Sequence, residues 1–156
     1  MKEMDKVKVK IKKLHPDAVV PTYGTEGAAG FDFYALEDCT IKPTETKLIK
    51  TGIAMEIPFG YEVQVRPRSG MSLKTLFRVA NAPGTIDCDY RGECNVIGHN
   101  AHQNGMGNST TFDINIKKGD RIAQGVLNKV PQADFEVVEE LGDTNRGTGG
   151  YGSTGQ

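Results

Sequence analysis

The sequence predicts an all-β protein, a jelly-roll-like β-barrel of short strands with at most one short helix and a flexible C-terminal arm. Three observations support this fold class. Apolar and polar residues alternate over short runs, as they do in strands with one buried face. Glycine and proline residues separate many of these runs. Helical character is confined to one short stretch, and many short strands joined by turns favour a closed or double-sheet β fold.

The first expected strand covers residues 6–11, where two valines and an isoleucine share one face and lysines share the other. A turn at residues 58–60, with the sequence PFG, separates two later strands. The one expected helix is short, at residues 72–77. The remaining strands are expected at 31–35, 46–50, 52–57, 61–65, 77–80, 92–97, 111–116, 122–129 and 135–138.

Length and composition indicate one globular domain. The chain has 156 residues, of which 37% are hydrophobic and 25% charged. We expect the jelly-roll domain at residues 1–142 and the arm at 143–156. A net charge of -1 argues against wholesale binding to nucleic acid or membranes.

The three cysteines lack a CxxC spacing, which favours reduced thiols over a disulfide framework or a zinc site. The first residues have no apolar signal core, and no run approaches the roughly 20 apolar residues of a membrane helix. We therefore expect a soluble protein in the cytoplasm, or in the host cytoplasm or nucleus if the source is viral.

The C-terminal residues 146–156 read RGTGGYGSTGQ and offer nothing that fills a core. Glycines allow backbone N–H groups to approach anionic oxygens, Ser153 and Thr154 add hydroxyl donors, and Arg146 adds a planar charged fork. Tyr151 can stack on a base. Such a segment is disordered alone and can become ordered on a phosphorylated ligand; the alternative is an inert polar tail.

Residues 81–93, NAPGTIDCDYRGE, carry the densest chemistry. Asp87 and Asp89 are two apart, so on a strand both point to one side. A carboxylate pair of this kind can bind metal, act as a base, or simply face solvent. The tight turn expected at residues 82–84 exposes backbone groups to a planar ligand, and Tyr90 supplies a ring.

Residues 99–110, HNAHQNGMGNST, interrupt the regular spacing of strands. His99 and His102 are three apart, which allows a metal site, although no further ligand is evident. The alternative is an exposed hairpin loop, and long loops are often functional.

Five motifs in order resemble the five signatures of the homotrimeric dUTPases, the dUTP nucleotidohydrolases: AGFDFYA, RPRSG, GTIDCDYRGE, GDRIAQ and RGTGGYGSTG. Tyr151 stands where the family more usually has phenylalanine. The resemblance implies a β jelly roll, a homotrimer with sites at subunit boundaries, and Mg2+-dependent hydrolysis of dUTP to dUMP and pyrophosphate. Such a reaction removes dUTP from the nucleotide pool and supplies the precursor of dTTP.

The resemblance also implies residue roles. Asp87 would orient and deprotonate a water that attacks the α-phosphorus; an aspartate is normally ionised at neutral pH and can accept a proton. Tyr90 would pack on the deoxyribose and leave no room for a 2′-hydroxyl. The uracil edge would be read by Asn81 and by the turn that contains Gly84, Thr85 and Ile86.

The phosphate contacts implied by the family come from several motifs. Asp32 would act on Mg2+ indirectly, through its water shell. Arg66 is expected to face outward, and Asp120 and Arg121 to be structural. Tyr151 would stack over uracil. The phosphate donors would be Arg68, Ser69, Gly70 and Gln124, and the γ-phosphate would be held by Arg146, Gly152, Ser153 and Thr154.

Two other functions stay open at this stage. A dCTP deaminase-like enzyme would share the jelly roll but typically relies on a glutamate. An additional regulatory role would use an unknown protein partner bound through residues 99–110.

Overall fold

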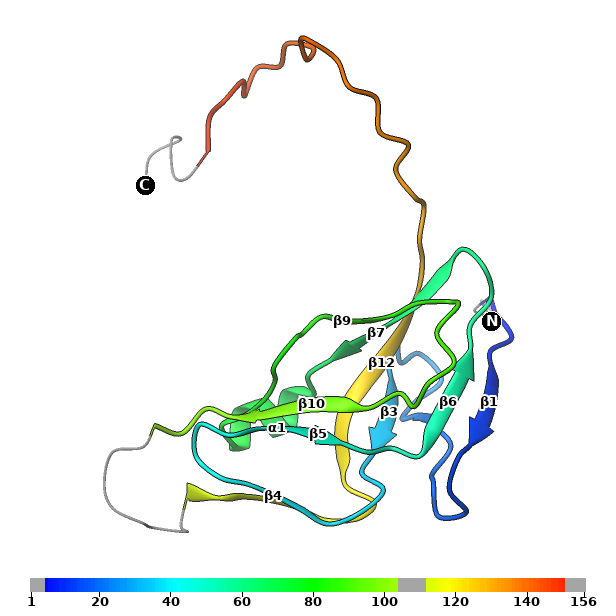
Figure 1. The fold of residues 1–156 in the computed structure, drawn as a ribbon, viewed down its shortest axis with the longest axis vertical. Coiled ribbons are helices and arrows are strands. Elements are labelled where there is room, and N and C mark those ends of the chain that lie inside the picture. The colour runs from blue at the N-terminus through cyan, green and yellow to red at the C-terminus, as the bar shows by residue number, and fades with distance from the viewer. Residues whose placement is uncertain (1–4, 104–111, 151–156) are drawn as a thin grey trace.

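The computed structural model describes residues 5–103 and 112–150 (Figure 1). This part of the chain is all-β apart from one short helix, α1 (Ser69–Lys74). The strands are β1 (Lys10–Lys13), β2 (Thr22–Tyr23), β3 (Phe31–Tyr34), β4 (Cys39–Ile41), β5 (Thr46–Ile49), β6 (Ile53–Glu56), β7 (Tyr61–Arg66), β8 (Phe77–Val79), β9 (Gly84–Ile86), β10 (Val96–Asn100), β11 (Ile114–Ile116) and β12 (Arg121–Lys129).

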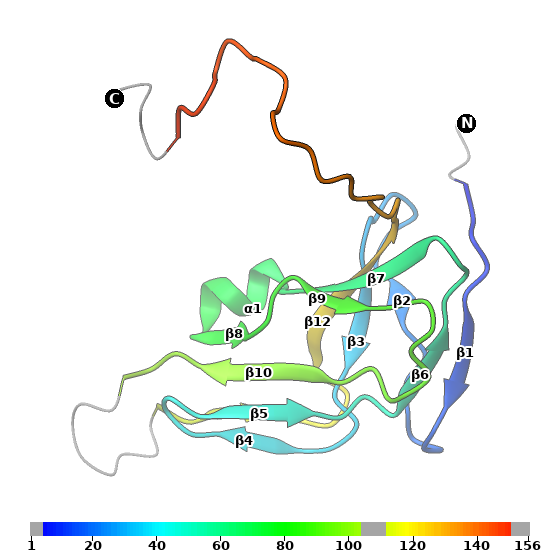
Figure 2. The same ribbon diagram turned by 45° about the horizontal axis from the view of Figure 1, so that its top comes forward.

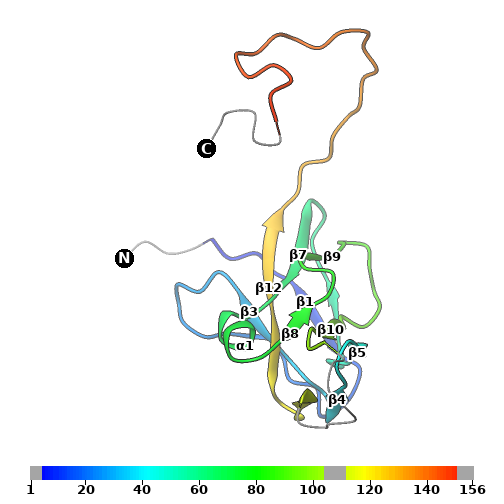
Figure 3. The ribbon, with the colours of Figure 1, turned by 90° about the vertical axis from the view of Figure 1, so that its left-hand side faces the viewer.

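The described strands form four antiparallel sheets in a jelly-roll fold. The largest has the order β2-β3-β12-β7-β9, a second has the order β5-β10-β8, and β1-β6 and β11-β4 form pairs. Figures 2 and 3 show the β5-β10-β8 sheet to one side of the long strands β7 and β12. The expected jelly-roll fold class is confirmed, and of the closed and double-sheet arrangements that the sequence favoured, the described strands do not join into one continuous cylinder.

Strand alternation places the core between the sheets. Val63 and Val65 of β7 are buried, and so are Phe31 and Phe33 of β3, while their neighbours along each strand are only partly buried. The ring of Phe31 packs against Gly125 of β12, where an added Cβ would overlap it. The sequence-based strands at 31–35, 46–50, 52–57, 61–65, 77–80 and 122–129 are therefore confirmed, with small shifts at their ends.

Several boundaries differ from expectation. In the segment 6–11 the alternating apolar residues are half-buried as expected, yet strand pairing begins only at Lys10, opposite Glu56. The strand expected at 92–97 begins at Val96, and before it Glu93 makes only an isolated bridge with Ala54. In the segment 111–116, strand β11 starts at Ile114.

The helix lies three residues before its expected position of 72–77. Thr75 ends it, since both its backbone N–H and its hydroxyl donate to the carbonyl of Met71. Phe77 then enters β8 as a buried residue of the sheet rather than a helical one.

The strand expected at 135–138 is not formed in this chain. Phe135 and Val137 are 91% and 99% exposed, and residues 130–150 contain no strand or helix. In Figure 1 this segment leaves the end of β12 and runs away from the sheets. An extended segment needs a neighbouring strand for its backbone hydrogen bonds, and no described strand pairs with it.

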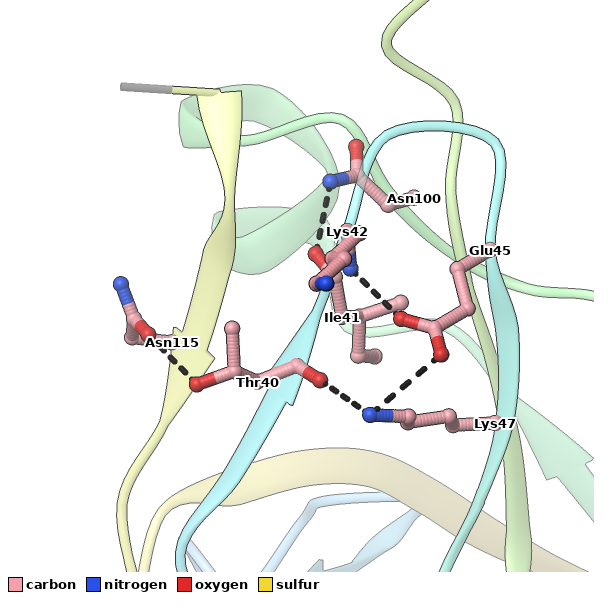
Figure 4. Close-up of polar contacts among 7 residues, drawn as sticks. All are labelled: Thr40, Ile41, Lys42, Glu45, Lys47, Asn100 and Asn115. Carbon is pink, nitrogen blue, oxygen red and sulfur yellow. Dashed lines mark hydrogen bonds and ion pairs between the residues drawn. The ribbon is translucent and has the colours of Figure 1, made fainter. Parts of the chain in front are cut away.

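A buried asparagine fixes the chain on both sides of the segment that was expected to be a loop from His99 (Figure 4). Asn100 is fully buried; its Nδ2 donates to the carbonyls of Ile41 and Phe112, and its Oδ1 accepts from the backbone N–H of His102. His99 belongs to β10 and not to the loop, because it pairs with Thr46 and Arg78. The loop's residues 104–111 lie outside the described residues.

In the same region, Glu45 organises the turn between β4 and β5. Its carboxylate accepts from the backbone N–H of Lys42 at 2.8 Å and pairs with Lys47 at 3.4 Å (Figure 4). Among the described residues, no helix has the length and apolar character needed to cross a bilayer.

Candidate active site

A hollow of about 290 Å³ lies beside β9 and contains the residues expected to read a base. This volume is at the lower end of the range for small-molecule sites. We call it the base hollow; its lining is Leu48, Val65, Asn81, Gly84, Thr85, Ile86, Asp87, Tyr90, Glu93, Cys94, Asn95 and Ile97. Asp87 and five of the six residues assigned to base and sugar recognition, all except Tyr151 of the arm, are therefore gathered in one place.

Strand β9 and the turn before it form one wall of this hollow. Gly84 and Ile86 are buried on β9, which pairs with β7, while Thr85 between them is exposed. The turn before β9 is closed by a hydrogen bond from Ala82 N–H to Val79 O. The Asn81 side chain folds back over Gly84, where an added Cβ would approach its Nδ2 to 2.9 Å.

Asp87 is exposed at the end of β9. The strand ends at Ile86, and the next residues turn, with Tyr90 N–H donating to Asp87 O at 3.2 Å. The two-residue spacing suggested that Asp87 and Asp89 share one face of a strand. Both residues lie beyond the end of β9, so they do not. Only Asp87 of the two lines the base hollow, and both line a neighbouring hollow between this turn and the start of β7.

The Tyr90 ring is folded back over the loop that follows it. Its hydroxyl donates to Glu93 O at 3.2 Å, and an added Cβ on Gly92 would overlap the ring. Glycine at position 92 therefore lets the ring occupy this position at the mouth of the base hollow.

The loop's far end is tied to β6. The Glu93 carboxylate accepts from the backbone N–H of Gly52 at 2.7 Å, Cys94 N–H donates to Ile53 O at 2.7 Å, and the buried Thr51 hydroxyl donates to Cys94 O at 2.8 Å. Sequence reasoning missed the part played by Glu93. The signal was a charged residue inside the strand expected at 92–97, which alone does not distinguish a side chain that holds the backbone from a solvated one.

The phosphate-binding residues of the resemblance line a second hollow, of about 270 Å³. We call it the phosphate hollow; its lining is Gly24, Thr25, Ala28, Gly30, Asp32, Arg68, Ser69, Gly70, Arg121 and Gln124. Its elements meet because β12 pairs with both β3 and β7, which brings Gln124 opposite Asp32 on one side and Arg66 on the other.

Asp32 stands between two arginines in this hollow. Its Oδ1 lies 2.8 Å from Arg68 Nε, and its Oδ2 lies 3.5 Å from Arg121 Nη1. Gln124 Nε2 donates to the carbonyl of Pro67 at 2.8 Å, and Gly30 leaves room for the Gln124 side chain. Asp120 accepts from the backbone N–H of Lys117 at 2.8 Å, so it braces its own turn.

The two hollows are separate within one chain. They share no lining residue. Asp87 follows Ile86, which pairs with Val63, whereas Arg68 lies five residues beyond Val63. The extended part of this path, from Val63 to the end of β7 at Arg66, measures about 10 Å, and the chain then turns into α1 at Ser69. The structure thus brings the sequence-predicted residues together in two groups and not in one.

The start of the arm's motif forms a local turn. Arg146 Nε donates to Gly149 O at 2.8 Å, and Gly147, with a φ of 50°, donates to Thr144 O. The expected contacts of Tyr151, Gly152, Ser153 and Thr154 lie outside the described residues.

The cysteines and histidines offer no described metal centre. Cys39 and Cys88 are half-buried and Cys94 is buried, all as free thiols. Burial raises the pKa of the Cys94 thiol to about 11, so it stays protonated at neutral pH. The described residues contain no cluster of three histidine, cysteine or carboxylate side chains suited to a metal ion. The His99 ring instead contacts the Thr46 hydroxyl.

One polar atom of the base hollow stands out. The Asn95 Oδ1 is buried and has no hydrogen-bond partner in the described part of the chain. Asn95 lines the base hollow, and sequence reasoning did not single it out. A lone asparagine at a strand start gives no signal until the fold places it against a hollow.

The chain is similar to known proteins along nearly its whole length. The sequence profile of the dUTPase family matches residues 17–155. The chain is 55% identical over 150 residues to the deoxyuridine 5'-triphosphate nucleotidohydrolase of Nautilia profundicola, covering 96% of this chain and 100% of that protein. It is 48% identical over 149 residues to the protein of the same name from Helicobacter pylori strain P12, covering 96% and 97%.

The fold is also similar to those of solved dUTPase structures. The dUTPase of Staphylococcus bacteriophage 80alpha with dUPNHPP has a TM-score of 0.88 at 28% identity, covering 97% of this chain and 100% of that one. A mutant dUTPase of phage phi11, solved with attention to a structural Mg(II) ion, has a TM-score of 0.79 at 26% identity, covering 86% and 99%. With the family profile spanning nearly the whole sequence, the chain belongs to the dUTPase family.

Proposed function

We propose that this protein hydrolyses dUTP to dUMP and pyrophosphate. The observation that carries the proposal is the placing of Asp87, an exposed carboxylate, at the edge of a small hollow that also holds Asn81 and Tyr90. Asp87 accepts a proton from a water, and the resulting hydroxide attacks the α-phosphorus. The bond between that phosphorus and the α,β-bridging oxygen breaks, and pyrophosphate leaves.

The base hollow suits uracil. Its apolar walls fit a planar ring, and the unpaired Asn95 Oδ1 is an acceptor for an N–H group such as that at uracil N3. Backbone groups from Gly84 to Ile86, with Asn81, read the remaining edge. A base that presents the wrong donors leaves buried groups unsatisfied, at a cost of about 1–3 kcal/mol for each. The Tyr90 ring covers the sugar and excludes a 2′-hydroxyl.

The phosphate hollow suits a triphosphate that arrives with Mg2+. Magnesium is commonly bound by one or two carboxylates together with substrate phosphates and its own waters, so the single carboxylate of Asp32 fits an indirect contact. Bound magnesium would neutralise charge on the phosphate oxygens. Arg68, Ser69, Gly70 and Gln124 supply the N–H and O–H donors around the phosphates.

We further propose that the working enzyme is a homotrimer in which the two hollows of one site come from different subunits. Within one chain Asp87 and Arg68 line different hollows that share no residue, so a neighbouring subunit would be needed to bring the two halves together. The arm supports association independently. Phe135, Val137 and Leu141 are almost fully exposed on a segment without pairing, and apolar side chains in this state favour burial against another chain.

The arm closes the site in this proposal, with residues 143–156 as its functional part. Arg146, Gly152, Ser153 and Thr154 hold the γ-phosphate and Tyr151 stacks on uracil. Deleting residues 146–156 should leave a folded trimer whose kcat/KM for dUTP is lowered roughly 100-fold, because water is no longer excluded and the phosphates lose their last contacts. Circular dichroism and light scattering check the fold and assembly, and normal turnover would mean that the arm is idle.

Substrate choice tests the proposed reaction directly. Purified protein is supplied with dUTP, dCTP or UTP, and pyrophosphate and ammonia are measured. We expect pyrophosphate from dUTP alone. Ammonia from dCTP would instead support the deaminase reading, and equal rates with UTP would remove the role given to Tyr90.

A further inference from the structure

We propose that Arg121 is a positioning residue of the phosphate hollow: it holds Asp32, and Asp32 in turn orients Arg68 toward the triphosphate. This inference rests on the proposed function, because it assigns a role within the phosphate half of that site. The motif resemblance gave Arg121 a structural role only.

Asp32 is a largely buried carboxylate with two cationic partners. Its side chain is only 13% exposed and its two oxygens are divided between Arg68 Nε and Arg121 Nη1. A largely buried carboxylate requires compensating charge. Arg68 alone would neutralise it, so the second arginine leaves one net positive charge beside the hollow. An anionic ligand is favoured by this surplus.

Two contacts fix the guanidinium group of Arg68. Its Nε is engaged by Asp32, and its Nη1 donates to the backbone carbonyl of Arg121 at 3.4 Å. No described residue accepts a hydrogen bond from its Nη2. A guanidinium group is rigid and planar, so contacts at Nε and Nη1 fix the direction of Nη2. The Nη2 group is therefore held ready for a phosphate oxygen.

Arg121 lines the phosphate hollow, and the charged group that its side chain contacts there is Asp32. This arginine opens β12 next to a register shift between Arg121 and Ala123, and its side chain is 53% exposed. Its nearest described charge partner is the second oxygen of Asp32, on the side away from Arg68 Nε. Arg121 therefore acts through Asp32. Losing it should loosen Arg68 and weaken binding of the phosphates, with little effect on the attacking water.

The first experiment compares Arg121→Ala, Arg121→Lys and a matched control. Lys118→Ala removes a cation that is equally exposed, at 53%, and that pairs with the exposed Asp17 at 2.6 Å. We expect Arg121→Ala to raise the KM for dUTP about three- to tenfold, with kcat changed by less than about twofold. Arg121→Lys should recover most of the affinity, and Lys118→Ala should match the parent.

The second experiment asks whether Arg121 acts through Asp32. The double variant Asp32→Asn with Arg121→Ala should have the same KM as Asp32→Asn alone, because the carboxylate that Arg121 holds is already gone. Inorganic tripolyphosphate, tested as an inhibitor, should weaken in parallel with dUTP in Arg121→Ala, whereas inhibition by deoxyuridine should be unchanged.

Two results would overturn the inference while leaving the proposed function standing. One is an Arg121→Ala enzyme with the parent's KM. The other is an additive loss in the double variant, which would make Arg121 a direct phosphate ligand. Failure of the parent protein to hydrolyse dUTP would instead contradict the proposed function, and it is measured before any variant is made.

Discussion

Asp87→Asn should retain nucleotide binding and lose turnover of dUTP by roughly two to four orders of magnitude, the range typical of a lost general base. The amide keeps the size and much of the hydrogen bonding of the carboxylate but cannot accept the proton of the attacking water. The side chain is exposed at the end of β9 and has no structural partner among the described residues, so the fold should be unaffected. Steady-state kinetics give the loss, and titration with a non-hydrolysable α,β-imido analogue of dUTP gives the affinity.

Asp17→Asn is a suitable control for this variant. It removes an exposed carboxylate too, but one that pairs with Lys118 and lies in neither hollow. We expect its turnover to equal that of the parent. Full activity of Asp87→Asn would remove this carboxylate from the mechanism, and lost affinity with lost turnover would make Asp87 a binding residue.

Strict alternation allowed most of the long strands to be predicted from sequence. In β7 the two inward valines alternate with polar residues, and that pattern survives in the structure as alternating burial. The short strands β2, β4 and β9 were missed because two or three residues are too few to show a period. Their pairing comes from neighbouring strands, which a local pattern does not contain.

The segment 135–138 illustrates a different limit. Its alternation of Phe135 and Val137 with acidic residues is a genuine strand pattern, yet no strand forms within this chain. An alternating pattern predicts that one face of a strand is buried. It does not predict which chain buries that face. If the proposed trimer is correct, this prediction failed only because its partner belongs to another subunit.

In the site, too, the chemistry of each motif could be predicted from sequence, whereas contacts between distant segments could not. Collinear motifs predicted many residues of both hollows, because each motif carries its own chemistry, but they did not predict Asn95. Their separation could not be predicted, since it depends on the register by which β9 pairs with β7. The pairing of Asp32 with Arg121 was missed for the same reason: it joins motifs far apart in sequence through the β3–β12 register.

The separation of the hollows leads to the second large effect, which is complementation between two inactive variants. Asp87→Asn spoils the base hollow and Arg68→Ala spoils the phosphate hollow, and each homotrimer should be almost inactive. Equal amounts of the two variants are unfolded together and refolded as mixed trimers. A site is intact if an Arg68→Ala chain supplies its base hollow and an Asp87→Asn chain supplies its phosphate hollow. Random assortment in a closed ring makes about one quarter of the sites intact.

A second mixture gives this experiment its control. Parent chains mixed equally with chains carrying both substitutions should also keep about one quarter of the activity if each site spans two subunits, because both contributors must then be parent chains. If each chain instead contained a complete site, the first mixture would stay inactive and the second would keep about one half. Sites that span two subunits thus predict equal activities for the two mixtures, whereas sites within one chain predict activity in the second mixture alone. Mass spectrometry of the mixed trimers verifies the assortment. The measured activities depend on which chain carries each hollow and not on the size of either single loss. The two mixtures therefore test the placing of the hollows on β7 and β9 independently of the chemistry assigned to Asp87.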